Sequence, residues 1–325
     1  MPQIGSVFQR LLLITNGASK QQHLILSRRL IFLSGNKPNF FILGAPKCGT
    51  TALAEWLGAH PNILMSSYKE PHFFNTDDRR LVDTMEHYEH FFRGAGPQHR
   101  AIGEASVWYL SSAQAVPGIL RYQPDARFIA MLRNPVDMAP ALHAEMIFTG
   151  MENEGDFAKA WGLQEERRAG QMIPASCLVP RRLLYGEACL LGAQLDRLLA
   201  LVPAKRVLTV LLDDLQRDAR HQYLRVLSFL EVSDDGRSDF VVRNASKIRR
   251  WPFLIKLSHA ITIVRHQLDI QGGLGLWRRI DALNRIERRR QSLSPTLKAQ
   301  LKEYFAPDVM RLSRLLGINL GTWLA

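Results

Sequence analysis

The stretch that decides the fold is Phe40-Phe41-Ile42-Leu43-Gly44-Ala45-Pro46-Lys47-Cys48-Gly49-Thr50-Thr51. An apolar run, typical of a buried strand, passes into a loop bracketed by two glycines, and two hydroxyl residues follow where a helix begins. Backbone N–H groups in such a loop, together with the positive end of the helix dipole, form a site for a phosphate-like anion. The stretch therefore predicts an anion-binding strand–loop–helix unit.

The position of the lysine distinguishes this loop from one that binds ATP or GTP. A nucleotide P-loop reads G-x-x-x-x-G-K-[ST], with the lysine directly after the second glycine. Here Thr50 follows Gly49, and the lysine is Lys47, inside the loop. The loop keeps the features of an anion cradle but places its cation elsewhere, which argues against an ATP- or GTP-dependent enzyme.

Outward from this unit, apolar segments alternate with segments of helical pattern. This alternation predicts a parallel sheet covered by helices on both faces. The expected strands cover 40–44, 101–106, 127–132 and 206–212, and the expected helices cover 50–60, 112–122, 278–290 and 295–316, with one more beginning at Asn134-Pro135. We therefore predict an α/β, P-loop-like three-layer fold with a central parallel sheet flanked by helices, plus a helical C-terminal extension.

The length of the chain, 325 residues, suits one large domain. We expect an N-terminal extension over 1–36 and one domain over 37–325, with the helical elaboration from about 250 onward. No run approaches the ~18–20 apolar residues that cross a bilayer, so we expect no transmembrane segment. The extension carries a short apolar patch, Leu11–Ile14, and peripheral membrane contact stays open as an alternative.

The composition favours an anionic partner. Lys and Arg number 42 against 30 Asp and Glu, for a formal net charge of +12. Such a field attracts nucleic acid, membrane surfaces and anionic small molecules, but the chain has no signature of a nucleic-acid-binding fold, so we expect no nucleic-acid partner. The three cysteines are too few for a disulfide framework and are typical of a reducing compartment. We therefore predict a cytoplasmic protein.

Four motifs, taken together, resemble a known family. They are Pro46-Lys47-Cys48-Gly49-Thr50-Thr51-Ala52-Leu53, Lys69-Glu70-Pro71-His72-Phe73-Phe74, Gly103-Glu104-Ala105-Ser106 with Tyr109, and Leu132-Arg133-Asn134-Pro135-Val136-Asp137. In this order and at these separations they resemble the sulfotransferases that use 3′-phosphoadenosine 5′-phosphosulfate (PAPS), with the strongest similarity to the bacterial and heparan-sulfate-type branch. The resemblance extends from about residue 40 to 231 and makes the domain at 37–325 a sulfotransferase domain.

The resemblance implies that the anion in the cradle is the 5′-phosphosulfate of PAPS. The implied contacts are Lys47, Cys48, Gly49, Thr50 and Thr51. Lys47 also offsets charge on the bridging oxygen as its bond to sulfur breaks. Cys48 is expected to fill the loop rather than to act as a nucleophile, because no histidine lies nearby in sequence to serve as its base.

The other end of PAPS carries a 3′-phosphate, which the resemblance assigns to Arg133, a rigid fork of donors at a strand end. Relatives usually place a serine in the following helix for the same phosphate, and here that position is Ala141. Lys247 and Arg249, in the basic stretch 243–250, are expected to complete this contact. A solvated basic loop is the alternative reading of that stretch.

On the acceptor side, Glu70 is the implied general base, which takes a proton from an acceptor hydroxyl or amine. Its apolar and aromatic neighbours in sequence favour a raised pKa, and a surface ion pair with Lys69 is the alternative. His72 is the competing base, or part of the wall of the site. Glu104 either orients a loop or touches the acceptor.

The acceptor itself stays open, with carbohydrate, lipid and small-molecule hydroxyls or amines as the classes considered. The lysine that heparan-sulfate-type enzymes often carry after Glu104 is here Ala105, which removes a natural contact for an acidic polysaccharide, so heparan-like acceptors are not expected. No metal is expected, since no Cys/His cluster has zinc spacing. Two other functions are kept: a P-loop nucleotide kinase or NTPase, with Asp213-Asp214 as its magnesium ligands, and a non-catalytic basic binding protein with a sulfotransferase fold. The oligomeric state is not predicted.

Overall fold

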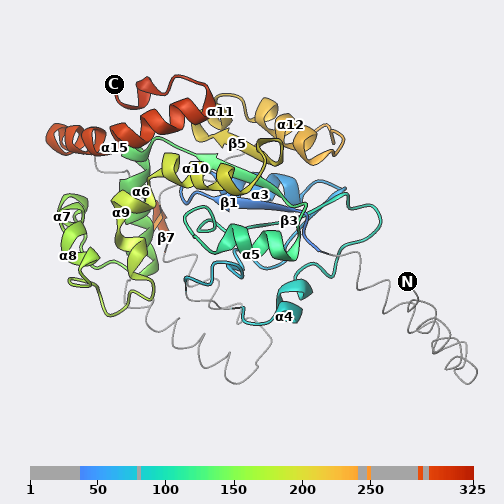
Figure 1. Cartoon of the computed structure of the whole chain (residues 1–325), viewed down its shortest axis with the longest axis horizontal. Helices are drawn as coiled ribbons and strands as arrows, with labels where there is room; N and C mark the ends of the chain where they lie inside the picture. The colour runs from blue at the N-terminus through green and yellow to red at the C-terminus, as the bar shows by residue number, and fades with distance from the viewer. Residues whose placement is uncertain (1–36, 79–81, 241–246, 250–284, 288–292) are drawn as a thin grey trace, which may run out of the picture.

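The central sheet has five parallel strands in the order β2-β3-β1-β4-β5 (Figure 1). The computed structural model describes residues 37–78, 82–240, 247–249, 285–287 and 293–325. All residues of β1 are buried, as expected for the central strand of a sheet covered on both faces. The strands are β1 (Phe40–Gly44), β2 (Ile63–Met65), β3 (Ala101–Ala105), β4 (Arg127–Leu132) and β5 (Val207–Leu211).

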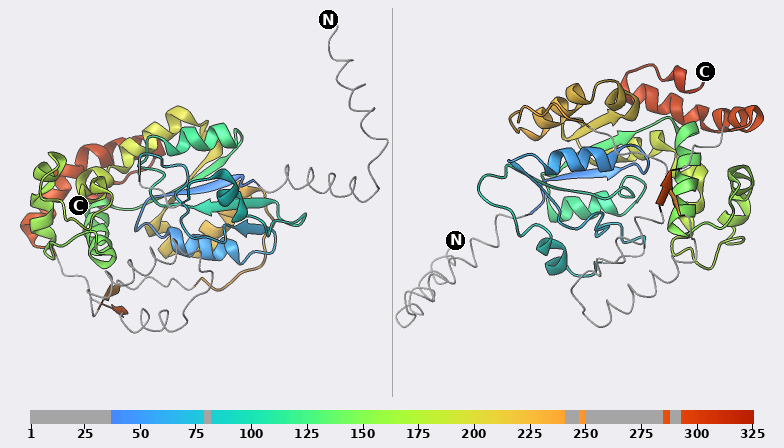
Figure 2. Two further views of the ribbon diagram at one scale, coloured as in Figure 1. Left: turned by 90° about the horizontal axis from the view of Figure 1, so that it is seen from below. Right: turned by 180° about the vertical axis from the view of Figure 1, so that it is seen from behind.

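Helices cover both faces of the sheet (Figure 2). On one face, Trp56 of α3 and Tyr223 of α12 both contact the ring of Phe240. On the other face α5 packs against α10, which in turn packs against the long helix α15. The three-layer α/β prediction is therefore confirmed. The bounds are α3 (Thr50–Gly58), α5 (Ala115–Tyr122), α10 (Leu191–Leu201), α12 (Ala219–Leu230) and α15 (Pro295–Leu316).

The helix α6 (Pro135–Thr149) leaves the end of β4 and carries the chain away from the sheet. The side chain of Asn134 caps it by accepting a hydrogen bond from the amide of Val136, and Pro135 occupies the tolerated first position. Gly150, at φ 76°, ends it in a left-handed conformation. The start of α6 is thereby fixed directly beside the end of β4, where the functional side chains gather.

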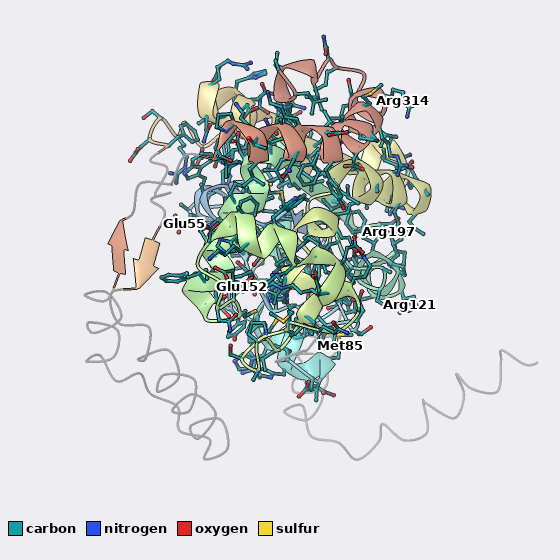
Figure 3. The ribbon with its side chains drawn as sticks, turned by 90° about the vertical axis from the view of Figure 1, so that its left-hand side faces the viewer. Glu55, Met85, Arg121, Glu152, Arg197 and Arg314 are labelled. Carbon is teal, nitrogen blue, oxygen red and sulfur yellow. The ribbon has the colours of Figure 1, made fainter. Side chains whose placement is uncertain are left out.

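A group of short helices follows α6, and the buried carboxylate of Glu152 lies among them (Figure 3). Arg167 forms an ion pair with Glu152 at 2.8 Å, and Tyr185 donates a hydrogen bond to the same carboxylate at 2.7 Å. A buried carboxylate with partners on both sides holds the group together. The remaining bounds are α4 (Met85–His90), α7 (Phe157–Gly162), α8 (Gln164–Arg168), η1 (Pro180–Leu183), α9 (Tyr185–Ala188), η2 (Ala204–Arg206), α11 (Leu212–Arg217) and η3 (Gly321–Trp323).

The structure corrects the sequence-based elements in three places. The strand β2 was not predicted, and its three residues are too few for a periodic signal. The helix expected at 278–290 is wrong at β7 (Arg285–Glu287), and the basic stretch 243–250, where no strand was predicted, contains β6 (Lys247–Arg249). These two strands pair with each other, antiparallel, with Ile248 opposite Ile286. The two strands lie far apart in the chain, and local sequence patterns do not reveal a pairing of this kind.

Close packing between β1 and β3 leads to a stability prediction for Gly103. A Cβ at Gly103 would lie 2.3 Å from the ring of Phe40, its partner in the sheet, and that ring is fully buried. Gly103→Ala is therefore expected to lower the free energy of unfolding in urea by about 1–3 kcal/mol through overpacking. Gly155→Ala is the matched control, because nothing lies within 4 Å of its added Cβ. Equal losses in the two variants would contradict the packing argument.

Candidate active site

The loops that leave the carboxyl ends of the strands meet at one edge of the sheet, as the parallel topology requires. The amide of Ser106, just after β3, donates to the carbonyl of Ile42 in β1 at 3.1 Å. The amide of His72, in the loop after β2, donates to the hydroxyl of Ser106 at 3.1 Å. Arg133, just after β4, donates to the carbonyl of Lys47 at 3.1 Å. These hydrogen bonds bring the four motifs together at the strand-end edge of the sheet.

The anion-binding loop passes into helix α3 at Gly49, whose φ of 90° lies in the left-handed region that favours glycine. The first helical hydrogen bond runs from the amide of Leu53 to the carbonyl of Gly49 at 3.2 Å. The amides of Thr50 and Thr51 precede it in the first turn of α3, where N–H groups have no partner within the helix. Those amides are therefore placed as a phosphate-like anion requires.

The cation of the cradle forms an ion pair that the sequence did not predict. Nζ of Lys47 lies 2.9 Å from Oε2 of Glu145, which α6 carries, and the two side chains are 33% and 38% exposed. Glu145 lies one helical turn beyond Ala141, the position that relatives give to serine. Helical spacing from Ala141 was the one signal that pointed toward Glu145. At this exposure the pair is weak enough for an anion to compete for the lysine.

Arg133 contributes to the cradle in two ways. Its hydrogen bond to the carbonyl of Lys47 fixes the loop backbone, where Lys47 has a left-handed φ of 64°. A guanidinium has five N–H donors, so this single bond leaves a charged fork beside the loop. Ala141 is buried and carries no hydroxyl, so a hydroxyl contact at that position is excluded.

Cys48 fills the loop. Its side chain is fully buried, and Sγ lies 3.5 Å from the carbonyl oxygen of Pro46 and 3.8 Å from Sδ of Met138. Burial raises the pKa of the thiol to about 12 and outweighs the opposing charges of Arg133 and Lys47. The thiol is thus neutral at physiological pH, which supports the packing role and argues against a nucleophile.

The loop after β2 brings a carboxylate and an imidazole together. Oε2 of Glu70 lies 3.3 Å from Nε2 of His72, and Nζ of Lys69 lies 3.9 Å from the other carboxylate oxygen. Burial acts to raise the pKa of Glu70, but the hydrogen bond and charge of His72 and the charges of Lys69 and Arg182 together hold it below its usual value. The predicted raised pKa is therefore wrong. Glu70 is an ionised carboxylate at neutral pH.

The segment that follows His72 is anchored by buried ion pairs that the sequence did not predict. The carboxylate of Asp78, fully buried, lies 2.6 Å from Nε of Arg181 and 2.9 Å from an Nη of Arg182. Burial raises the pKa of Asp78, but these two guanidinium groups outweigh it and keep the pKa below its usual value. Arg182 also lies over the ring of Trp108, at 4.8 Å from the ring centre. The wall beyond the Glu70–His72 loop is thereby fixed to η1.

The C-terminal tail reaches the same edge of the sheet. Nε1 of Trp323 donates to the carboxylate of Asp213 at 2.9 Å, and Nδ2 of Asn134 donates to the carbonyl of Trp323 at 3.1 Å. Asp214 pairs with Arg217 at 3.0 Å. Both aspartates that a kinase would use for magnesium are therefore engaged in structural contacts. In the described ranges, no three His, Cys, Asp or Glu side chains form a cluster suited to a metal ion.

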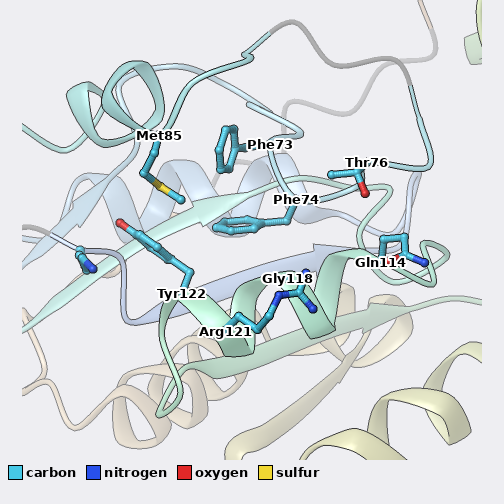
Figure 4. Close-up of a pocket in the computed structure, with 9 residues that line it drawn as sticks. Phe73, Phe74, Thr76, Met85, Gln114, Gly118, Arg121 and Tyr122 are labelled. Carbon is cyan, nitrogen blue, oxygen red and sulfur yellow. The ribbon is translucent and has the colours of Figure 1, made fainter.

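Two further features lie outside the cradle. A cavity of about 420 Å³ opens between α4 and α5 beside Phe73 and Phe74 (Figure 4), and its lining includes none of Lys47, Glu70 and Arg133. The strand β6 packs beside α6. The side chains of Lys247 and Arg249, predicted to contact the 3′-phosphate, lie outside the described part of the chain.

The fold and the site together define an α/β protein with a P-loop-like anion cradle whose lysine is displaced into the loop. Residues 37–248 match the family model described as the sulfotransferase domain, and the chain belongs to this family of transferases. A solved sulfotransferase from Alicyclobacillus acidocaldarius is similar, with a TM-score of 0.66 and 26% identity over 89% of this chain and 99% of that one.

Curated relatives are similar over shorter stretches. The membrane-associated sulfotransferase kil1 of Dictyostelium discoideum is 32% identical over 101 residues, which cover 31% of this chain and 21% of that protein. Human carbohydrate sulfotransferase 15 is 31% identical over 160 residues, which cover 36% of this chain and 28% of that protein. The chain thus matches less than a third of the length of these relatives.

The predicted cytoplasmic location is wrong, because the comparisons point to a membrane-associated relative. That prediction used the sparse cysteines and the absence of a long apolar run in the sequence. Neither feature distinguishes a cytoplasmic protein from one attached to a membrane. Among the described residues, no helix has the length and apolar character needed to span a bilayer.

Proposed function

We propose that this chain transfers the sulfuryl group of PAPS to an acceptor hydroxyl or amine. One observation carries the proposal: a cradle with a displaced lysine, steadied by Arg133, lies at the same strand-end edge as the paired Glu70 and His72. The cradle suits a phosphosulfate because it combines the amides of the first turn of α3 with the cation of Lys47. It has Thr50, not lysine, at the position where nucleotide P-loops carry their lysine. The family match supports this reading.

The transfer is proposed as an in-line displacement. An acceptor oxygen or nitrogen attacks sulfur, the bond from sulfur to the bridging oxygen breaks, and adenosine 3′,5′-bisphosphate leaves. Glu70, ionised at neutral pH, accepts the acceptor's proton. Lys47 and the amides of α3 stabilise the charge that develops on the bridging oxygen, and the work of the protein is mostly positioning and charge stabilisation, as in phosphoryl transfer.

The 3′-phosphate is proposed to bind Arg133 together with Lys247 and Arg249. Two observations support this. The guanidinium of Arg133 is fixed beside the loop, and β6 lies beside α6, the helix that begins two residues after Arg133. Because Ala141 provides no hydroxyl, basic side chains are the available substitutes.

The acceptor is proposed to be a carbohydrate hydroxyl. Human carbohydrate sulfotransferase 15 and mouse heparan sulfate glucosamine 3-O-sulfotransferase 6 carry carbohydrate acceptors in their names and resemble part of this chain. Lipid and small-molecule acceptors are the alternative outcomes of a transfer assay.

We also propose that residues 37–325 form one domain. The family match ends at 248, but α15 lies beyond it and packs against α10. Trp323 adds a contact to Asp213 at the end of β5. The extension at 1–36 lies outside the described residues.

Calorimetry and a transfer assay test the function. Adenosine 3′,5′-bisphosphate is expected to bind far more tightly than AMP, because only the former reaches Arg133 with a 3′-phosphate. Radiolabelled PAPS is expected to label desulfated polysaccharides in the presence of the protein. Equal affinity for the two nucleotides would exclude the assignment of Arg133. Tight binding without labelling of carbohydrate, lipid or small-molecule acceptors would favour the non-catalytic binding protein.

The ion pair between Lys47 and Glu145 leads to a separate prediction. Glu145→Gln is expected to tighten the binding of adenosine 3′,5′-bisphosphate by up to about fivefold, because an exposed ion pair that competes for the lysine is worth only ~0.2–1 kcal/mol. Glu55→Gln, on the exposed side of α3, is the matched control and should leave affinity unchanged. Weaker binding in Glu145→Gln would instead show that the carboxylate helps to orient the lysine.

A further inference from the structure

The strand β3 carries a fully buried carboxylate, Glu104, which the proposed reaction does not use. Its Oε1 accepts a hydrogen bond from the hydroxyl of Tyr88 at 3.0 Å, and its Oε2 accepts one from the hydroxyl of Ser106 at 3.2 Å. Among the described residues, the groups that act on it are hydroxyls of Tyr88, Ser106 and Tyr109, with no cation among them. A carboxylate buried without a cation is costly and calls for an explanation.

Two of these hydroxyls hold the loop that contains Glu70. The oxygen of Ser106 accepts the amide of His72 at 3.1 Å, and the oxygen of Tyr109 accepts the amide of Phe74 at 3.2 Å. A hydroxyl that donates its hydrogen to Glu104 presents its lone pairs to the loop. The carboxylate therefore sets the direction of the hydroxyls, and the hydroxyls set the position of the loop backbone.

The loop needs such support. Glu70 and His72 have left-handed φ values of 53° and 50°, which non-glycine residues rarely adopt. Conformations of this kind persist only where surrounding contacts fix them, and they cluster at functional sites. The hydrogen bond from the amide of His72 to the hydroxyl of Ser106 links the buried carboxylate of Glu104 to the Glu70–His72 pair.

We propose that Glu104 is a positioning residue for the transfer reaction: through Ser106 it holds the Glu70–His72 loop in the geometry in which Glu70 meets the acceptor. The proposal rests on the proposed function of Glu70. Glu104 itself touches neither donor nor acceptor, because its side chain is enclosed beneath the loop. The sequence left two roles open for Glu104, orientation of a loop and contact with the acceptor, and its enclosed position favours loop orientation.

The arrangement depends on pH. Burial raises the pKa of Glu104 to about 7, against the opposing hydrogen bonds from Tyr109, Tyr88 and Ser106. The groups that face it are Tyr88 from α4, Tyr109 and Ser106 from the segment after β3, and Tyr122 from α5. Burial also raises the pKa values of Tyr88 and Tyr109 well above their usual value, so these groups stay neutral.

Turnover is therefore expected to rise with pH through about 7, the pKa to which burial raises the carboxyl of Glu104. When Glu104 is ionised, it accepts a hydrogen bond from each neighbouring hydroxyl. Its protonated form instead donates a hydrogen bond to one of these hydroxyls, which reverses the direction of that hydrogen bond. The lowered pKa of Glu70 places the loss of the base itself below pH 4.5. The two titrations are thus well separated.

The experiment compares three variants of the full chain. Glu104→Gln and Ser106→Ala are expected to lower kcat about tenfold to a hundredfold, because small misplacements of a reacting group have effects of this size, and to leave the binding of adenosine 3′,5′-bisphosphate unchanged. The rise of kcat near pH 7 should vanish in Glu104→Gln. Tyr88→Phe is the matched control, since it removes a different hydroxyl from the same carboxylate while its ring keeps its packing on Phe73 and Phe74.

Amide hydrogen exchange gives a readout that does not need turnover. Residues 70–76 should lose protection in Glu104→Gln and Ser106→Ala but keep it in Tyr88→Phe. Normal protection and an unchanged pH profile in Ser106→Ala would overturn the positioning role, even if Glu104→Gln fails to fold. If the wild-type chain transfers no sulfate, the proposed function fails, and the exchange data still decide whether Glu104 holds the loop.

Discussion

Replacing Lys47 with alanine is expected to lower the turnover of sulfate transfer by about a hundredfold to a thousandfold, the size of effect seen when one preorganised group that stabilises developing charge is removed. The reason is geometric. Lys47 is the cation of the cradle, it lies inside the loop, and Arg133 fixes its backbone. Binding of adenosine 3′,5′-bisphosphate should weaken as well, about tenfold, because a charged hydrogen bond to the phosphate is lost.

Lys205→Ala is the matched control for this prediction. Lys205 is an exposed lysine in η2, just before β5, at the opposite edge of the sheet from the cradle. It should leave both turnover and affinity unchanged, although it lowers the net charge of the chain equally. If the two variants lost affinity to the same degree, the general positive field would hold the nucleotide, and the specific role of Lys47 would be excluded.

The sheet could be predicted from the sequence where strands are long and buried on both faces. The bounds of β1 and β4 agree with the prediction to the residue, because continuous apolar runs such as 127–132 have few other stable arrangements. The helix α15 agrees equally well, since Ser294 caps its start and Gly317 ends it. In contrast, β2, β6 and β7 have three residues each, and their pairing depends on distant segments.

The part of the site that could be predicted from the sequence is the set of residues that belong to the four motifs. The order of the loops along a parallel sheet brought Lys47, Glu70 and Arg133 to one edge, as expected. Their ion-pair partners were not predicted, because such contacts join segments far apart in the chain, as between Lys47 and Glu145 or between Asp78 and Arg181. Helical spacing from Ala141 pointed toward Glu145 but did not show its contact with Lys47. The predicted direction of the Glu70 pKa shift was wrong although the groups that lower it most, His72 and then Lys69, are its neighbours in sequence, with Arg182 adding a smaller effect. The sequence pattern does not show that these side chains turn toward the carboxylate.

Replacing Glu70 with glutamine is expected to lower turnover by about a hundredfold to ten-thousandfold, the usual contribution of a general base. The substitution keeps the size of the side chain and removes its basicity, so binding of adenosine 3′,5′-bisphosphate should be largely unchanged. In the wild-type chain, the lowered pKa of Glu70 means that its ionised form is lost only as pH falls below 4.5. Glu86→Gln, an exposed carboxylate on α4, is the matched control.

The same variant decides between Glu70 and His72 as the base. Their side chains lie 3.3 Å apart, so either one is placed to take the proton. If Glu70→Gln kept turnover within about threefold, a change of under ~1 kcal/mol in the barrier, Glu70 would not be the base. His72→Asn would then be expected to abolish the reaction. The opposite result, a large loss of turnover in Glu70→Gln and a small loss in His72→Asn, would show that Glu70 is the base. The imidazole of His72 would then serve to position the carboxylate and to favour its ionised form, as the lowered pKa of Glu70 indicates.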